Sequence, residues 1–266
     1  MTKNDLEYFK NWFSEYTKSF YSSNEEDQRN IMLKVEHTRN VRDNILQIAE
    51  GLSLSDNKMR LAETAALFHD VGRFPQYAKY KTFRDADSLS HDRLGMKILI
   101  REGLLERLPE DERELILKVV QFHGAFSIPT TFEGDHLLFL EMVRDADKID
   151  IFRVFLEYYD SPPEERASAT AFGVPDTPEY SDLMLSCIFN KKVASYSLIK
   201  TENDFKLMKL SWIYALCFDE SIRLLKERGL IEGLIAKLPQ TDEIKKAMGV
   251  LREYIEERLE NFDMKC

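Results

Sequence analysis

The sequence predicts an all-α fold. Apolar residues recur at intervals of three and four along most of the 266 residues, whereas the alternating pattern of a half-buried strand is absent or very short. Apolar residues make up 44% of the chain, which is enough to bury a sizeable core. Residues that start and stop helices punctuate this pattern, and they define the expected helices in order along the chain.

The first two long helices each carry a histidine on their apolar face. A helix over about 24–50 places His37 on its apolar stripe. Ser55 is a candidate N-cap for the next helix, which we expect to end at Gly72. In that helix His69 shares a stripe with small residues. Both histidines are therefore expected to point inward.

Three further helices bring more of these side chains together. Ser90 can cap a helix in which His91 occupies the first turn. A helix over 110–122 follows a proline and continues its apolar face into His123. A longer helix over about 135–159 contains an acidic cluster. Five expected helices thus carry the candidate ligands.

The rest of the chain is a loop followed by more helix. The stretch 160–180 contains four prolines and a glycine, so it reads as a loop, either a surface excursion or a lid. Helical periodicity returns over 183–262. It includes an expected helix over 205–228 that Gly229 closes and a charged terminal helix over about 242–262.

Composition excludes several classes of protein. The net charge of −10 argues against a broad basic surface that holds a nucleic-acid polymer, but it allows a small anionic substrate. No apolar run approaches a membrane span and the first residues lack a signal-peptide stretch, so we expect a cytoplasmic protein without a membrane partner. Cys187, Cys217 and Cys266 have no close spacing, which indicates reduced thiols rather than disulfides or a thiolate zinc site.

Four of the five histidines, together with Asp70, form a set suited to metal binding. Neutral imidazole and carboxylate favour divalent first-row transition metals over calcium. An ion that keeps an open position takes about four protein ligands or fewer. His37, His69, Asp70 and one later Asp supply that number. Adding His91 and His123 would furnish a second ion, with Asp70 as the bridge, which is the arrangement of two-metal attack on phosphate esters.

The later aspartate is either Asp145 or Asp147. Helical phase places Asp147 on an apolar face, whereas Asp145 shares its face with Glu141 and Lys148, the pattern of a solvated surface. We therefore expect Asp147 to be the ligand. Asp150 follows by three residues and is a candidate acceptor for the second ring nitrogen of a ligating histidine.

The ordered set resembles the motif of the HD-domain metal-dependent phosphohydrolases: His37, then His69 and Asp70, then Asp147. The segments 68–74 and 90–95 resemble the members that carry two extra histidines and bind two metals. The resemblance covers about residues 20–160. His123 stands alone where some members carry two histidines in succession, and the signature of the cyclic-dinucleotide phosphodiesterases is not evident, which argues against a cyclic-dinucleotide substrate.

The resemblance implies an HD-domain helical bundle with additional C-terminal helices. It further implies hydrolysis of a phosphate ester or nucleotide by a metal-activated water, with Asp70 as a catalytic residue. Two divalent ions, iron, manganese or another transition metal, would be held by six ligands: His37, His69, Asp70, His91, His123 and Asp147. Arg73 and Lys148 are candidates for holding the substrate phosphate, since an arginine fork matches phosphate geometry.

Other interpretations remain open. Inositol oxygenase has a related scaffold and a similar ligand set around two irons, so the protein is alternatively a di-iron oxygenase, or a metal-stabilised regulatory module without turnover. His91 and His123 are alternatively contacts for substrate phosphate or plain helix caps. Arg73 and Lys148 are alternatively partners in surface salt bridges.

The expected organisation has three parts. Residues 1–160 would form the metal-binding helical domain with its N-terminal helix, 161–182 a loop, and 183–266 a helical extension packed on the same bundle. The expected partner is a small anionic, phosphate-containing substrate, and the sequence leaves a homo-oligomer open.

Overall fold

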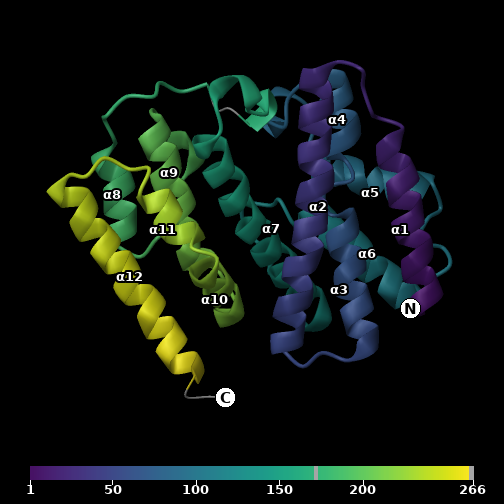
Figure 1. The fold of residues 1–266 in the computed structure, drawn as a ribbon. Helices are drawn as coiled ribbons and strands as arrows, with labels where there is room; N and C mark the ends of the chain where they lie inside the picture. Colours follow the sequence, from purple (N-terminus) through teal and green to yellow (C-terminus); the bar gives the residue numbers. More distant parts are fainter. Residues whose placement is uncertain (171–172, 264–266) are drawn as a thin grey trace. The chain divides into compact units, whose positions relative to one another are not determined.

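The computed structural model describes residues 1–170 and 173–263 (Figure 1). Over these residues the chain forms α-helices and short 3₁₀ helices and contains no strand. The predicted all-α fold is confirmed. In the same residues, no helix is both long and apolar enough to cross a membrane.

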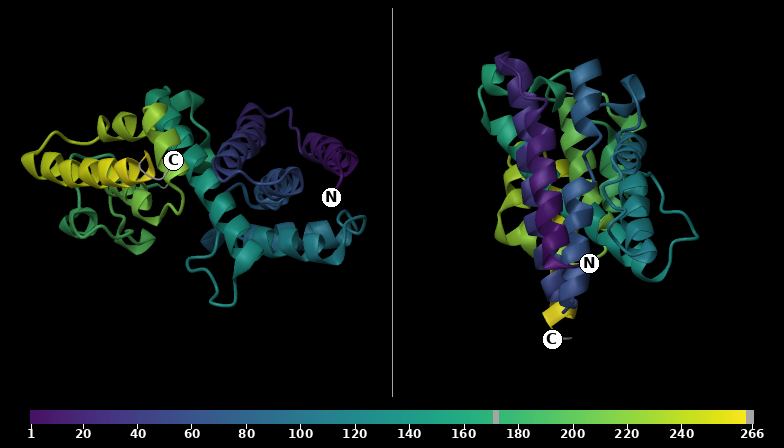
Figure 2. Two further views of the ribbon diagram at one scale, coloured as in Figure 1. Left: turned by 90° about the horizontal axis from the view of Figure 1, so that it is seen from below. Right: turned by 90° about the vertical axis from the view of Figure 1, so that its right-hand side faces the viewer.

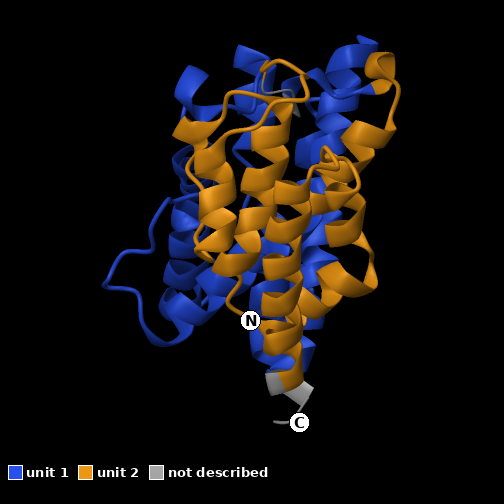
Figure 3. Cartoon of the chain, turned by 90° about the vertical axis from the view of Figure 1, so that its left-hand side faces the viewer, with its two compact units in different colours: residues 1–150, 166–171 blue, residues 151–165, 172–266 orange. Residues whose placement is uncertain are grey.

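The chain divides into two compact units, which Figure 3 colours separately. Unit 1 consists of Met1–Asp150 and Arg166–Ala171, and unit 2 of Ile151–Glu165 and Phe172–Cys266. The predicted segments 1–160, 161–182 and 183–266 stay a prediction. Each unit is described by itself below.

Unit 1 is a bundle of helices. Some of the helices that pack together follow one another in the chain, and others are separated by further helices. Its elements are α1 (Lys3–Lys18), α2 (Glu25–Gly51), α3 (Asp56–Phe68), α4 (Arg73–Tyr80), η1 (Asp85–Asp87), α5 (His91–Arg101), α6 (Glu110–Phe122), the first part of α7 (Gly134–Asp160) and η3 (Ser168–Thr170). Helices α1, α2 and α3 lie side by side (Figures 1 and 2). α6 packs on α3 and on α5. The core between them includes fully buried Val41, Ile45 and Phe68.

Several predicted helix limits are confirmed. Ser55 accepts a hydrogen bond from the amide of Lys58 at 3.4 Å, and Ser90 accepts one from the amide of Arg93 at 3.4 Å. Both side chains therefore cap the helices that follow them. α6 spans the predicted residues 110–122.

The helix predicted to end at Gly72 ends instead at Phe68. Residues 69–72 form a turn, with 3₁₀-type bonds from the amide of Val71 to the Phe68 carbonyl and from the amide of Arg73 to the Asp70 carbonyl, at 3.2 and 2.9 Å. The turn lets Gly72 lie against the start of α5, so close that a Cβ there would lie 2.0 Å from the carbonyl oxygen of His91. A helix that continued through Gly72 would not bring this residue so close to the start of α5.

Part of the predicted loop 160–180 returns to unit 1. α7 ends at Asp160, and residues 171 and 172 lie outside the described residues. The amide of Ala169 donates to Oδ1 of fully buried Asn30 at 3.0 Å, and Ser168 Oγ donates to Glu26 Oε1 at 2.6 Å. Residues 166–170, named the return segment here, are thereby tied to the first turns of α2.

Unit 2 contains the last residues of α7 and the helices that follow. Its further elements are η2 (Pro163–Glu165), α8 (Asp182–Phe189), η4 (Tyr196–Leu198), α9 (Glu202–Ser211), η5 (Trp212–Ala215), α10 (Asp219–Glu227), α11 (Leu230–Ile235) and α12 (Asp242–Asp263). α8 packs against α9 and α12, and α9 against α11. Cys187 and Cys217 are free thiols, as predicted, and Cys266 lies outside the described residues.

The predicted helix over 205–228 is wrong as a single element. α9 stops at Ser211, whose hydroxyl donates to the Met208 carbonyl at 2.6 Å and accepts from the amide of Ala194 at 2.9 Å. After the 3₁₀ turn η5 the backbone is extended at Leu216 and Phe218 before α10 begins. A short 3₁₀ turn keeps apolar residues about three apart, which is why the periodicity hid the break. Gly229, with φ of +67°, follows α10 as predicted.

Candidate metal centre

The backbone of unit 1 brings all six predicted metal ligands into one buried cluster. His37 lies in the middle of α2, His69 and Asp70 in the turn after α3, His91 at the first residue of α5, His123 at the C-cap of α6, and Asp147 on α7. The four histidines and Asp70 are each at most 5% exposed. Two metal-compatible groups emerge that share Asp70, one with His37 and His69 and one with His91 and His123.

The four imidazole rings share one orientation, with Nδ1 bonded away from the cluster and Nε2 directed into it. Their Nδ1 atoms contact Asp150 Oδ2 at 2.7 Å from His37, the Ala66 carbonyl at 2.7 Å from His69, Asp85 Oδ2 at 2.7 Å from His91, and the Val120 carbonyl at 2.8 Å from His123. Since these oxygens accept, each Nδ1 donates. A neutral ring then offers the lone pair of Nε2 to the cluster, as metal ligands do.

Asp70 lies between two pairs of histidines. Its Oδ2 is 3.5 Å from His37 Nε2 and 3.7 Å from His69 Nε2. Its Oδ1 is 3.4 Å from His91 Nε2 and 3.7 Å from His123 Nε2. We name the first group, with Asp147, half-site A, and the second group half-site B.

The spacing of these donor atoms fits metal coordination. Ligand bonds of about 2.1 Å place neighbouring donors about 3.0 Å apart in an octahedron and about 3.4 Å apart in a tetrahedron. The His37 and His69 Nε2 atoms are 3.4 Å apart, and the His91 and His123 Nε2 atoms are 3.1 Å apart. Each half-site therefore has donors at the separation that one transition-metal ion requires.

Asp147 completes half-site A, although the reason given for choosing it over Asp145 is wrong. Its Oδ1 lies 3.1 Å from His37 Nε2 and 3.9 Å from His69 Nε2. Asp145, expected on a solvated face, is fully buried, whereas the side chain of Asp147 is 21% exposed. α7 is buried on several faces, so exposure does not follow the helical period that the prediction assumed.

Two basic side chains flank Asp70, one at each carboxylate oxygen. Lys34 Nζ donates to Oδ2 at 2.7 Å, and Arg73 Nε donates to Oδ1 at 3.3 Å. Burial works to raise the pKa of Asp70, but Lys34, His69 and Arg73 together hold it well below its usual range. Asp70 is therefore ionised at neutral pH.

The histidines differ in their proton affinity. Burial lowers the pKa of His69 to about 4, and burial together with Arg73 lowers the pKa of His91 to about 4. Burial also works to lower the pKa of His37, but hydrogen bonds to Asp147 and Asp150 raise it above its ordinary value. His69 and His91 are thus neutral at pH 7 and able to ligate, whereas His37 binds its proton more tightly.

The structure places the two predicted phosphate contacts differently. The Arg73 Nη1 atom donates to Gln76 Oε1 at 2.9 Å and to Asp85 Oδ1 at 2.9 Å, while Nη2 makes no hydrogen bond within the described residues. Lys148 Nζ donates to the Arg144 carbonyl at 3.2 Å, one turn back on α7. Arg73 therefore borders the cluster, and its Nη2 atom is available to donate to a ligand.

Sequence reasoning missed two residues of this cluster. Lys34 lies three residues before His37 on α2, so helical spacing could have indicated it. Asp85, the acceptor for His91 Nδ1, lies in η1 with no periodic relation to that histidine, so no sequence pattern points to it. Asp150, suggested as an acceptor, does contact His37.

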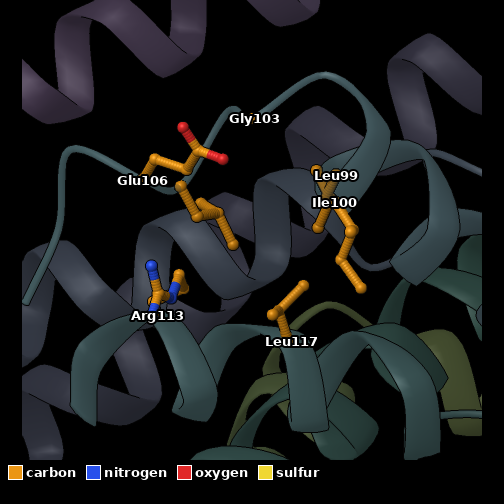
Figure 4. A pocket seen from close by; sticks show the side chains of 7 residues that line it. Leu99, Ile100, Gly103, Glu106, Arg113 and Leu117 are labelled. Atoms are coloured by element: carbon orange, nitrogen blue, oxygen red, sulfur yellow. The ribbon is translucent and has the colours of Figure 1, made fainter. Parts of the chain in front are cut away.

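A surface pocket elsewhere in unit 1 is separate from this cluster. Figure 4 shows its mostly apolar lining from α5, α6 and their connection: Leu99, Ile100, Gly103, Leu105, Glu106, Arg113 and Leu117. None of these residues belongs to either half-site. The pocket carries no group suited to phosphate chemistry beyond Arg113.

Comparison with known proteins gave one match. Residues 35–152 match the family model of the HD domain, a range that contains all six predicted ligands. No curated protein and no solved structure matched.

Proposed function

The chain carries an HD domain, and from this premise we propose that it is a phosphohydrolase that cleaves a small phosphate ester or nucleotide at a two-metal centre. HD domains bind divalent metals, and most members of the family are metal-dependent phosphohydrolases. The proposal thus adds two statements to this family property: that the centre holds two ions, and that the substrate is a small phosphate ester or nucleotide.

The observation that carries the proposal is the position of Asp70 between two pairs of Nε2 atoms. An ionised carboxylate with one oxygen in each half-site can bridge two ions. Half-site A adds Asp147 to its two histidines. Half-site B offers two histidines and Asp70, so an ion held there would have fewer protein ligands and would leave room for water or substrate. The proposed ligands are those predicted from the sequence: His37, His69, Asp70, His91, His123 and Asp147.

The protein groups would hold and orient the reactants. Two divalent ions, when bound, would supply a water of lowered pKa and would neutralise charge on the phosphoryl oxygens. Asp70 fixes the two half-sites relative to each other, and the acceptors at each Nδ1 fix the four rings. Arg73 Nη2 can donate to a phosphate oxygen, with Lys148 as a further candidate.

A di-iron oxygenase related to inositol oxygenase is the second candidate. The four imidazoles and two carboxylates would equally hold two iron ions. Oxygen requirement separates the two functions, since a hydrolase works without oxygen and with manganese.

The test begins with elemental analysis of protein purified without chelator or metal-affinity tag. We expect about two transition-metal ions per chain, and phosphate release from a panel of esters and nucleotides with Mn²⁺ under anaerobic conditions. Asp70→Ala should abolish hydrolysis while retaining the helical circular dichroism, and His91→Ala should lower the metal content without emptying the site. Asp70→Ala with more than half of the original activity would exclude this centre as the active site.

A further inference from the structure

Lys34 is a basic side chain that lies next to half-site A. It lies on α2 one turn before His37, and its Nζ is 2.7 Å from Asp70 Oδ2, the carboxylate oxygen that faces His37 and His69. The Nζ atom also lies 5.2 Å from the centre of the Phe83 ring. The side chain is 15% exposed, so it is held in place yet reaches solvent.

The ammonium group has donors to spare. It carries three N–H bonds, and within the described residues its one hydrogen bond goes to Asp70. The remaining N–H bonds of Nζ therefore lie next to Asp70 Oδ2, the oxygen that faces half-site A. An anion that enters this half-site therefore comes within reach of Lys34.

We propose that Lys34 is a substrate-binding residue, which donates a hydrogen bond to a phosphoryl oxygen at half-site A while it retains its bond to Asp70. The proposal rests on the proposed phosphohydrolase function and adds a contact that the HD motif does not contain. Arg73 approaches the other oxygen of Asp70 from α4. A phosphoryl group at the centre would thus meet one cation from α2 and one from α4.

Charge distinguishes this role from that of a clamp for Asp70. An ammonium beside a metal site repels the ion, so removing it should leave the metal content unchanged or raise it. If Lys34 instead served only to hold Asp70 in place, its removal would lower the metal content. A substrate-binding role predicts weaker anion binding at full metal content.

The experiment compares wild type, Lys34→Met, Lys34→Arg and Lys81→Met. Lys81 is a matched control: its Nζ donates to Asp27 Oδ2 at 2.6 Å and lies 5.3 Å from the Tyr77 ring centre, and among the described residues it contacts neither half-site. Each protein is loaded with Mn²⁺, its metal content is measured, and inorganic phosphate is titrated in by calorimetry. Steady-state kinetics with the best ester from the panel follow.

We expect Lys34→Met to bind phosphate roughly 10- to 100-fold more weakly, as the loss of a charge-assisted hydrogen bond implies, with a matching rise in KM at full metal content. Lys34→Arg should recover most of this loss, and Lys81→Met should behave as wild type.

Unchanged phosphate affinity in Lys34→Met would overturn the proposal, as would a loss of metal in that variant or a wild type that binds no phosphate. The proposed function fails separately. If phosphate binding depends on Lys34 but no ester is hydrolysed, the hydrolase is excluded and the anion contact stands.

Discussion

Two kinds of acceptor orient the four histidines of the centre. His69 and His123 donate to carbonyls three residues earlier, so their own helices fix them. His37 and His91 donate to carboxylates from elsewhere in the chain, Asp150 and Asp85. A side-chain substitution can remove a carboxylate acceptor, but it cannot remove a backbone carbonyl.

Asp150→Ala should weaken metal binding at half-site A by roughly 10- to 100-fold, because His37 loses the acceptor that sets its ring and tautomer. Competition with a chromogenic chelator measures this affinity. Asp135→Ala, which removes an exposed carboxylate on the same helix that pairs with Lys58, is the control and should have no effect. Equal affinities in the two variants would show that Asp150 does not support the site.

The residues of the site were predictable where they share the pattern of the helices that carry them. His37 and His123 continue apolar faces, and Ser90 marks the helix start that positions His91. Asp85 was not predictable, because the path of the connection between α4 and α5, and not a helical period, brings it to His91. Asp147 was chosen for a reason that the structure contradicts, because burial on α7 follows the packing around it rather than one stripe.

At the scale of elements, the contact between the turn 69–72 and the start of α5 joins the two half-sites. The turn carries His69 and Asp70, and α5 begins with His91. Gly72 and Gly95 both lie at this contact, where a Cβ on Gly72 would also lie 2.7 Å from the amide nitrogen of Gly95. The absence of side chains there allows the two segments to approach.

Gly72→Ala should destabilise the protein by at least about 2 kcal/mol, because the added methyl group meets backbone atoms that cannot rotate away. Chemical denaturation followed by circular dichroism measures the loss, and metal content should fall with it. The control is Gly249→Ala in α12, where no described atom lies within 4 Å of the new Cβ apart from the adjacent residues and the backbone of the same helix. That change should stabilise its helix by roughly 0.5–1 kcal/mol. A neutral Gly72→Ala would mean that the turn tolerates a shift.

Helix existence was predictable, and helix interruption was not. Capping serines marked the starts of α3 and α5, and Pro109 with the apolar stripe marked that of α6. The breaks after Phe68 and Ser211 depend on a backbone contact and on a hydroxyl that bonds a distant amide, and neither leaves a gap in the apolar period.

At the scale of the whole molecule, metal binding and folding of unit 1 should be coupled, since the proposed ligands come from four helices and the turn after α3. Mn²⁺ at about 100 times its Kd should stabilise the folded protein by about 2.7 kcal/mol and raise Tm by roughly 5–10 °C. Thermal unfolding with and without chelator measures the shift, and Asp70→Ala should abolish it.

This stabilisation should decrease as the pH falls. The pKa of His37 is raised, so metal-free protein holds a proton there that binding must displace. The metal-induced shift in Tm is therefore full above that pKa and is lost as the pH falls through it. The same shift at pH 8 and pH 6 would contradict this coupling between the His37 proton and metal binding.

The return of residues 166–170 to unit 1 lay beyond sequence reasoning. Contacts between residues more than a hundred positions apart, such as that of Asn30 with Ala169, leave no local pattern. Prolines and a glycine marked the loop but not the surface to which its middle part binds.

The return segment has a consequence for synthesis. The chain leaves unit 1 after Asp150 and comes back to it at residue 166. The ribosome must therefore synthesise residues 151–165, which belong to unit 2, before it has made all of unit 1. Until Ala169 emerges, the Oδ1 atom of Asn30 lacks the amide that it accepts from in the folded protein. A nascent chain that stops near residue 150 would carry every proposed ligand and still be unfinished at the first turns of α2.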